Sequence, residues 1–335
     1  MHVHETPLFT KGSQWGNLSA SGGRLYVIKK QNSMTTKKHY DAIIIGGSYA
    51  GLSAAMSLGR SLSNVLVIDS GTPCNRQTPH SHNFLTQDGK RQEKIAAIAK
   101  EQVSKYNTVD FFNGLATTGN KTVYGFDITT QSGEVFSARK LVFATGLNDI
   151  MPDIEGFAEC WGISVLHCPY CHGYEVKNQK TGIVANGDGA FHYAQLISNW
   201  TDSLWVFTNG KSTLSDEQTT TIHKHNIHIV EEKISWFDHD GGKIGSVIFE
   251  DGSSISVNTI YSGPDFVQQC SVPEKLGCEM TEQGHLKVDL LQKTSVEGVY
   301  AAGDNATMFR AVSIAVSAGT IAGAAVNMEL IVEDF

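Results

Sequence analysis

The sequence predicts an α/β protein of two domains, each built on a parallel sheet of strand–turn–helix–strand units. The chain has 335 residues, whereas one domain usually has about 100–200. Two segments, starting near Ile43 and near Thr181, each show a buried strand, a turn, a helix and a second strand. The hydrophobic fraction of 41% and the charged fraction of 18% are typical of a folded chain.

The first unit has the pattern of a dinucleotide-binding turn. The strand Ala42–Ile45 leads into the turn Gly46–Gly51, and a helix is predicted from there to about Arg60. A second strand, Val65–Ile68, ends in Asp69, which lies 23 residues beyond the start of the turn. This order and spacing predict a turn that holds a pyrophosphate and a carboxylate that accepts ribose hydroxyls.

Ser48 departs from the usual G-x-G-x-x-G pattern of such a turn, because it replaces the middle glycine. That glycine lets the backbone approach a pyrophosphate, whose charge is met by N–H groups at the helix N-terminus. Serine is the smallest side chain that could still allow this approach, and a glycine turn without a ligand is the alternative interpretation. The candidate cofactor-binding residues of this unit are Gly46, Gly47, Ser48, Ala50, Gly51 and Asp69.

The later segments supply the remaining elements. A helix is predicted over Arg91–Tyr106, and the strand Leu141–Ala144 ends at Thr145-Gly146. The second unit runs from the strand Thr181–Ala185 to the strand Leu204–Phe207. A last strand, residues 298–302, leads into Gly303-Asp304, and the small-residue stretch 311–326 is predicted to be a packed internal helix rather than a membrane span.

The net charge and the amino-terminal residues limit which partners and which cellular location we expect. Lys+Arg number 26 and Asp+Glu 34, a net charge of −8, so no basic excess favours nucleic acid or an anionic membrane as a partner. The first 33 residues lack the apolar run of a secretory signal, which favours a cytoplasmic protein. Met34 precedes a polar segment and a strong strand, so residues 1–39 form a leader that is either disordered or a mis-assigned start.

Cys168 and Cys171 are the only closely spaced cysteines, and they lie between His167 and His172. A C-x-x-C pair can form a small disulfide and take part in dithiol–disulfide exchange. A zinc knuckle and an inert structural pair are the alternatives, although zinc needs four ligands and no second cysteine or histidine module is present. No metal is therefore expected. The other cysteines are expected to be small buried hydrophobes, namely Cys74, Cys160, Cys270 and Cys278.

Four motifs together resemble the low-molecular-weight thioredoxin reductases, which are FAD-dependent pyridine nucleotide-disulfide oxidoreductases. The motifs are residues 43–51, 144–146, 168–171 and 298–304, and the resemblance covers about residues 40–332. It implies two Rossmann-like domains of three-layer ββα type. Residues 40–152 and 264–332 would form a discontinuous FAD-binding domain. Residues 153–263 would form an inserted NAD(P)-binding-like domain that carries the CPYC redox motif.

The resemblance also implies roles for individual residues, with FAD as the cofactor and a homodimer as the assembly. Asp304 would contact FAD, and Arg310-Ala311 would begin the helix over the isoalloxazine. Cys171 would face the flavin, and Cys168 would react with the substrate. The other residues that the likeness assigns to the cofactor are Ser70, Arg76, Asn83, Ala144, Thr145, Gly146 and Gly303.

Three departures from the reductase pattern change the expected chemistry. Ala185 replaces the first glycine of the second turn, and the segment Thr208–Thr213 offers one lysine and no arginine for a 2′-phosphate. NADPH binding is therefore not favoured. His172 replaces the acidic residue that usually follows the C-x-x-C motif, and it is the expected proton shuttle.

These departures, with the segment 168–175 and the loop 74–83, look most similar to the gliotoxin- and holomycin-type dithiol oxidases. That resemblance implies oxidation of a dithiol, either a small molecule or a thioredoxin-like protein, with electrons passed through FAD to oxygen. The alternatives are a thioredoxin reductase that uses NADPH or another donor, and a redox-sensing flavoprotein without turnover. In the loop, His80 and His82 either lie near the flavin edge or are solvated.

Overall fold

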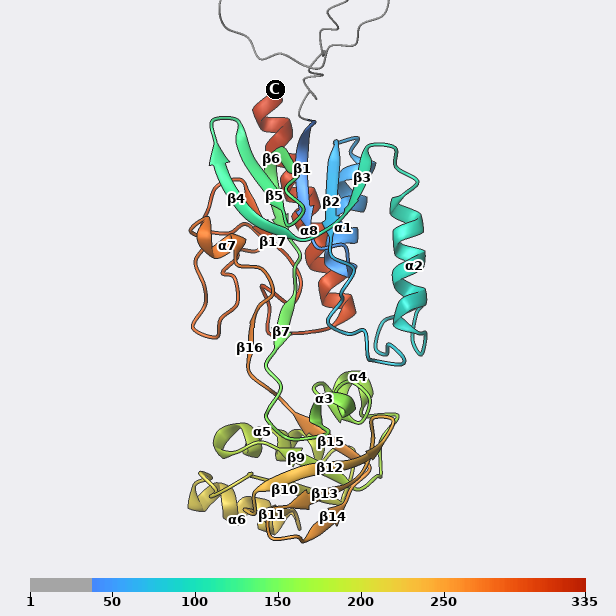
Figure 1. Ribbon diagram of the computed structural model, residues 1–335, viewed down its shortest axis with the longest axis vertical. Helices are drawn as coiled ribbons and strands as arrows, with labels where there is room; N and C mark the ends of the chain where they lie inside the picture. Colours follow the sequence, from blue (N-terminus) through green and yellow to red (C-terminus); the bar gives the residue numbers. More distant parts are fainter. Residues whose placement is uncertain (1–37) are drawn as a thin grey trace, which may run out of the picture. The chain divides into compact units, whose positions relative to one another are not determined.

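A seven-stranded sheet forms the core of the first and last parts of the chain (Figure 1). The computed structural model describes residues 38–335, so the predicted leader, apart from its last two positions, lies outside the described residues. The parallel strands of this sheet are β3 (Val109–Asn113), β2 (Val65–Asp69), β1 (His39–Ile45), β6 (Val135–Phe143) and β17 (Val299–Ala301). The antiparallel strands are β5 (Gly125–Thr130) and β4 (Ala116–Thr122).

Both faces of this sheet are covered, which explains why β1 is apolar at successive positions. Ala42 and Ile44 belong to a core with three helices, and Ile43 and Ile45 belong to a second core with residues of β4, β5 and the short helix α7. The helices are α1 (Tyr49–Arg60), α2 (Gln92–Val103), α8 (Val312–Asp334) and α7 (Val272–Lys275).

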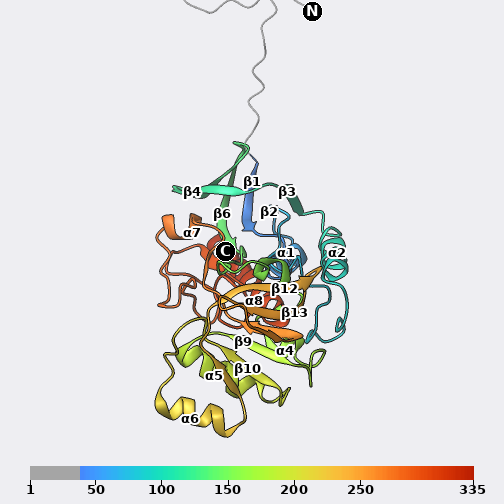
Figure 2. The same cartoon turned by 60° about the horizontal axis from the view of Figure 1, so that its bottom comes forward.

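A second, five-stranded parallel sheet is formed by the middle of the chain. Its strands, in spatial order, are β11 (His228–Val230), β10 (Leu204–Phe207), β9 (Thr181–Val184), β15 (Thr259–Ser262) and β8 (Val165–Leu166). Figure 2 shows two helices next to β9 and β10, namely α5 (Gly187–Ile197) and α6 (Asp216–Lys224).

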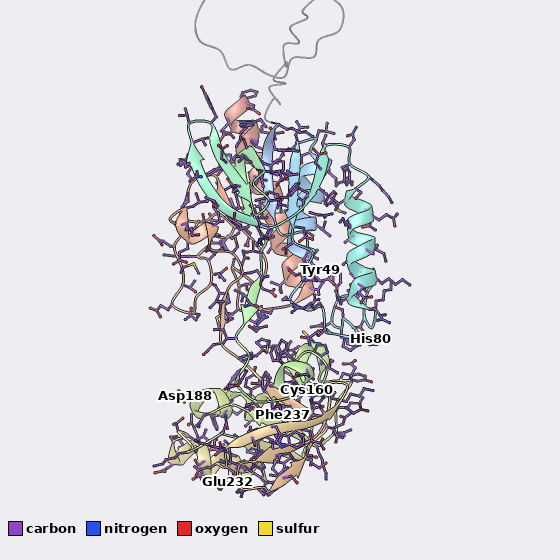
Figure 3. The ribbon with its side chains drawn as sticks, in the orientation of Figure 1. Tyr49, His80, Cys160, Asp188, Glu232 and Phe237 are labelled. Atoms are coloured by element: carbon purple, nitrogen blue, oxygen red, sulfur yellow. The ribbon has the colours of Figure 1, made fainter. Side chains whose placement is uncertain are left out.

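The other face of the second sheet packs on a small antiparallel sheet. The strands of that sheet are β12 (Ile234–Asp240), β13 (Lys243–Phe249) and β14 (Ser254–Ser256), and a short helix, α3 (Phe157–Cys160), packs beside them. Phe237 and Cys160 are both buried in the core between these layers (Figure 3).

Two short strands connect the two large sheets along the chain. β7 (Leu147–Asp149) follows β6, and it pairs in antiparallel with β16 (Phe266–Gln268), through which the chain returns. The redox motif lies on a one-turn helix, α4 (Pro169–His172). The α/β fold class with two Rossmann-like parallel sheets, predicted from the sequence, is confirmed.

The small residues of α8 pack against α1, as predicted for an internal helix. Within residues 38–335, α8 is the one helix long and apolar enough to cross a membrane by length and composition. Its small-residue face is nevertheless buried in the α1 side of the core. A Cβ on Gly319 would lie 2.0 Å from the carbonyl oxygen of Ala50, and one on Gly323 would lie 2.6 Å from that of Ala54. The two helix backbones are therefore in direct contact.

Replacing Gly319 with alanine should destabilise the protein, although helix propensity alone would favour alanine by about 1 kcal/mol. The new methyl group would overlap the Ala50 carbonyl, and overpacking of this kind costs about 1–3 kcal/mol. Urea unfolding of Gly319→Ala should show that loss in the free energy of unfolding, whereas Ser317→Ala, on the exposed side of α8, should change it little. Equal or higher stability of Gly319→Ala would contradict the close helix contact.

Candidate active site

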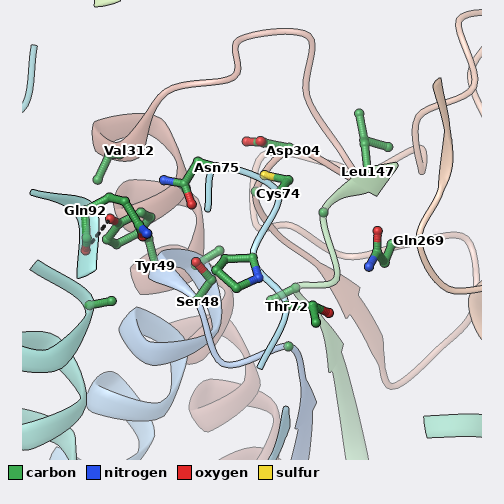
Figure 4. A pocket seen from close by; sticks show the side chains of 18 of the residues that line it. Ser48, Tyr49, Thr72, Cys74, Asn75, Gln92, Leu147, Gln269, Asp304 and Val312 are labelled. Carbon is green, nitrogen blue, oxygen red and sulfur yellow. Dashed lines mark hydrogen bonds between the residues drawn. The ribbon is translucent and has the colours of Figure 1, made fainter. Parts of the chain in front are cut away.

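A cavity of about 460 Å³ lies where β1, β2 and β6 end, and it also reaches α4 and the start of α8 (Figure 4). The carboxyl ends of parallel strands are the usual place for a ligand in an open α/β sheet. The predicted site residues that line the cavity are Gly46, Gly47, Ser48, Ala50, Asp69, Ser70, Ala144, Thr145, Gly146, Cys168, Cys171, His172, Gly303, Asp304, Arg310 and Ala311.

The turn at the start of α1 is tight because its backbone is in contact with itself and with β6. Gly46 has φ +105°, and a Cβ there would lie 2.2 Å from the carbonyl oxygen of Ala144. A Cβ on Gly51 would lie 1.8 Å from the carbonyl oxygen of Gly46. Only glycine fits at these two positions. Gly51 therefore closes the turn from behind and does not line the cavity.

The donors and acceptors of this turn fit a dinucleotide. The backbone N–H of Gly47 donates to Oδ1 of Asp69 at 3.0 Å, which holds the carboxylate at the end of β2. Ser48 begins α1 without a side-chain hydrogen bond to the helix. The first N–H groups of a helix have no partner within it, and these adjoin the cavity wall at Ser48–Ala50. An anionic pyrophosphate would satisfy them.

A charged cluster forms the opposite end of the cavity. The Arg310 guanidinium binds Asp149 through two hydrogen bonds, Nη1 to Oδ1 at 2.6 Å and Nη2 to Oδ2 at 3.0 Å. Its Nε lies 3.7 Å from Oδ2 of Asp304. Burial raises the pKa of Asp304, and the guanidinium partly offsets this effect. An acceptor is thus held in the wall of the cavity beside a fixed cation.

Two other predicted cofactor residues do not line the cavity. Arg76 is exposed, and its Nη1 lies 3.5 Å from the carbonyl oxygen of Pro73. Asn83 has φ +57°, and its backbone N–H donates to Asp88 at 2.8 Å. Both residues belong to the irregular segment between β2 and α2, whose path the sequence pattern does not predict.

Several wall residues were not found from the sequence, and Figure 4 shows most of them. Tyr49 lies inside the first turn and Asn75 inside the loop 74–83, but no chemical role was predicted for either residue. The others belong to no motif, so only their positions close to the turn or to the linking strands could have indicated them. These residues are Tyr49, Thr72, Asn75, Gln92, Leu147, Gln269 and Val312. The hydroxyl of Tyr49 donates to the carbonyl oxygen of Gln92 at 3.4 Å.

Cys74 differs from the sequence-based expectation. Cys160, Cys270 and Cys278 are buried, as expected for small hydrophobic residues, but Cys74 is exposed and lies in the cavity wall. The expectation was wrong for Cys74 because the loop that follows β2 carries it across the cavity rather than into a core. Figure 4 shows its sulfur near Asp304.

Cys168 and Cys171 lie at the start and in the middle of α4, with both thiols free and the Sγ atoms 2.8 Å apart. The Cys171 thiol donates to Cys168, and this lowers the pKa of Cys168 to about 7 against the effect of burial. The same hydrogen bond, with burial, raises the pKa of Cys171. In the dithiol form, Cys168 is therefore the first of the two to become a thiolate, as the pH rises through about 7, and Cys171 is its proton-bearing partner.

Four histidines line the cavity together with the cysteine pair. Burial lowers the pKa of His172, and the neighbouring His82 lowers it further. Burial also lowers the pKa of His167 to about 4. Both His80 and His82 line the cavity, and the side chain of His82 is only 18% exposed. His172 is therefore neutral at pH 7, and the loop histidines lie beside the site.

The second turn, at the start of α5, is filled by the protein's own groups. Oδ1 of Asn186 accepts from the backbone N–H groups of Gly187 and Thr213, each at 2.8 Å. Its Nδ2 donates to the carbonyl oxygen of Lys211 at 2.9 Å. A Cβ on Gly187 would lie 2.8 Å from Oγ1 of Thr213. Residues 211–213 thus occupy the space in front of the helix, where a dinucleotide pyrophosphate would bind.

Comparison with known proteins shows similarity over nearly the whole described chain. The family model described as pyridine nucleotide-disulphide oxidoreductase matches residues 40–319. The chain is 32% identical to "Thioredoxin reductase tcpT" of Claviceps purpurea, over 90% of this chain and 97% of that protein. Among solved structures, an oxidoreductase from Agrobacterium tumefaciens is 35% identical with a TM-score of 0.83, covering 88% of this chain and 99% of that one. A putative thioredoxin reductase TrxB from Bacillus anthracis is 32% identical with a TM-score of 0.85, covering 88% and 100%.

Alkylation of the reduced protein should distinguish the two cysteines of α4. Iodoacetamide should modify Cys168 before Cys171, with a half-maximal rate near pH 7, because a thiolate reacts and a thiol does not. Peptide mass spectrometry at a series of pH values measures both rates, and the buried Cys160 serves as an internal slow control. Faster modification of Cys171 would contradict the direction of their hydrogen bond.

Proposed function

The chain belongs to the pyridine nucleotide-disulphide oxidoreductase family, and we propose that within it the protein is an FAD-dependent dithiol oxidase. Membership makes it a flavin-dependent disulfide oxidoreductase similar to thioredoxin reductases. The proposal adds the direction of the reaction: a substrate dithiol is oxidised by the Cys168–Cys171 pair, and oxygen is the final acceptor.

The observation that carries the proposed direction is the filled turn at α5. A nicotinamide dinucleotide needs free N–H groups and a tight glycine turn there. In this chain Asn186 and Thr213 use that space for their own hydrogen bonds, and Ala185 replaces the first glycine. The segment also has no arginine fork for a 2′-phosphate. These features support a protein that does not take its electrons from NADPH.

FAD is the cofactor that the family implies, and the cavity fits it. The first turn, Asp69 and Asp304 supply N–H donors for a pyrophosphate and carboxylate acceptors for hydroxyl groups. When bound, FAD supplies the two-electron acceptor that reoxidises the cysteine pair and passes the electrons to oxygen, which yields hydrogen peroxide. Cys168 and Cys171 line the same cavity as these acceptors.

Dithiol–disulfide exchange accounts for the part of the reaction that the cysteines perform. One substrate thiolate attacks Sγ of Cys168, the bond to Cys171 breaks, and Cys171 leaves with the electron pair. The second substrate thiolate then attacks the mixed disulfide, which releases Cys168 and the oxidised substrate. The substrate loses two electrons and two protons, and the enzyme disulfide gains the two electrons.

We assign to His172 the role of taking a proton from the substrate. Because burial lowers its pKa, the imidazole stays neutral at pH 7 and can act as a base. Its neutral form is lost only as the pH falls through that lowered pKa. In the reductase pattern an acid follows the cysteines, so a neutral base at this position supports the oxidase direction.

The second candidate is a thioredoxin reductase, which the printed names of the similar proteins favour. Under either function the substrate carries a dithiol or disulfide, as a small molecule or a thioredoxin-like protein. We further propose a cytoplasmic homodimer. The FAD domain would comprise residues 40–152 and 264–332, and the inserted domain residues 153–263.

Flavin reduction without oxygen separates the two candidates. A small dithiol such as dithiothreitol should bleach the flavin, and air should restore the colour with formation of peroxide. NADPH should bleach it slowly or not at all, because the missing phosphate contacts weaken binding at least about a hundredfold. Stopped-flow absorbance measures both reactions, and complete bleaching by NADPH within about a second would favour the reductase.

Serine substitutions test the cysteine pair. Cys168→Ser and Cys171→Ser should each abolish dithiol turnover, because exchange needs both sulfur atoms. Cys160→Ser and Cys278→Ser remove buried thiols outside the cavity and should retain activity when the variants fold. Oxygen consumption with dithiothreitol is the measurement. Turnover by either variant of the pair would show that the disulfide is not the reacting group.

A further inference from the structure

His82 is held against the cysteine helix by a closed loop. The backbone N–H of Ser81 donates to the carbonyl oxygen of Lys90 at 2.8 Å, and that of Gly89 donates to the carbonyl oxygen of Ser81 at 2.9 Å. Asp88 accepts from the backbone N–H of Asn83 inside this loop. These contacts close residues 81–90 on themselves and fix the direction in which His82 leaves the backbone.

The imidazole of His82 faces charged and titratable groups from both parts of the chain. Its Nδ1 is buried and makes no hydrogen bond within residues 38–335, but it lies 3.4 Å from Oε1 of Glu175. Asp88 lies 3.8 Å from the same nitrogen. The rings of His80 and His172 have centroids 6.5 Å and 6.2 Å from that of His82. The ring of His172 meets it edge-on, at 84°.

His172 needs an exit for its proton if it is the base of the reaction. Its ring lines the cavity next to Cys171, and burial keeps its pKa low. A proton taken from a substrate thiol must reach water before His172 can act again. The bound substrate and cofactor would fill much of the cavity. His82, in the wall of the same cavity, lies beside the His172 ring, and it is next to Glu175, whose side chain is 39% exposed.

We propose that His82 and Glu175 form a positioning dyad that carries the proton from His172 to solvent. This inference rests on the proposed function. In each turnover one of the two protons that the substrate loses passes from its thiol to His172, from His172 to His82, and from His82 to water beside Glu175. The other proton stays on the Cys171 thiol until the pair is reoxidised, and water returns the second proton that peroxide formation needs. Glu175 orients the His82 ring and offsets the positive charge while the proton is in transit.

The test is the anaerobic reduction of the FAD-loaded enzyme by dithiothreitol, followed by stopped flow across the pH range. His82→Gln should slow flavin bleaching at least about tenfold, and added imidazole should restore the rate by carrying the proton. Glu175→Gln keeps the His82 ring and should cause a smaller loss. His223→Gln, which removes an exposed histidine on α6, is the matched control and should bleach at the wild-type rate.

The pH profiles give a readout that a merely structural role would not change. His82 lowers the pKa of His172, and Glu175 raises it. The pH below which the bleaching rate falls should therefore be higher in His82→Gln and lower in Glu175→Gln than in the wild type. Flavin absorbance shows whether each variant retains FAD.

Two results would overturn the dyad while the proposed function stands. One is that His82→Gln and Glu175→Gln both bleach the flavin at the wild-type rate, with unchanged pH–rate profiles. The other is a slow His82→Gln that imidazole does not rescue and whose bleaching rate falls below the same pH as in the wild type. A wild-type enzyme that only NADPH bleaches would instead contradict the proposed function, and the dyad with it.

Discussion

Direct backbone contact around the first turn is the constraint on which the site depends. The carbonyl oxygen of Ala144 would lie 2.2 Å from a Cβ on Gly46, and that of Ala50 would lie 2.0 Å from one on Gly319. The end of β6, the turn and α8 therefore meet with no side chain between them. Because protein interiors are close-packed, a single added methyl group here would shift the helix start that lines the cavity.

The charged cluster links the cavity to the connection between the two sheets. Asp149 is the last residue of β7, and the side chain of Arg310 reaches it from just before α8. The pair is largely buried, so loss of one partner would leave the other charge without compensation. The same guanidinium lies beside Asp304. The Arg310 guanidinium thus holds both Asp304, the acceptor at this end of the cavity, and β7, the linking strand.

The site takes its chemistry from segments that are far apart in the chain. The cradle for the cofactor belongs to β1, α1 and the segment before α8, whereas the cysteines and His172 belong to α4. Gln77 donates to the carbonyl oxygen of Ala158 at 3.2 Å, and His82 lies beside Glu175. The loop between β2 and α2 therefore contacts the segment between β7 and β16 at two places, one on α3 and one just after α4.

The sequence by itself determined the fold class, the first turn and the C-x-x-C pair. These features are local, because strand periodicity, glycine spacing and a two-residue gap between cysteines each act over a few residues. Only the tertiary structure decided that Cys74 lies in the cavity wall, that Asn186 fills the second turn, and that Arg310 binds Asp149. The partners in the last pair are 161 residues apart. Such contacts depend on how whole segments pack, and no short-range pattern in the chain specifies that packing.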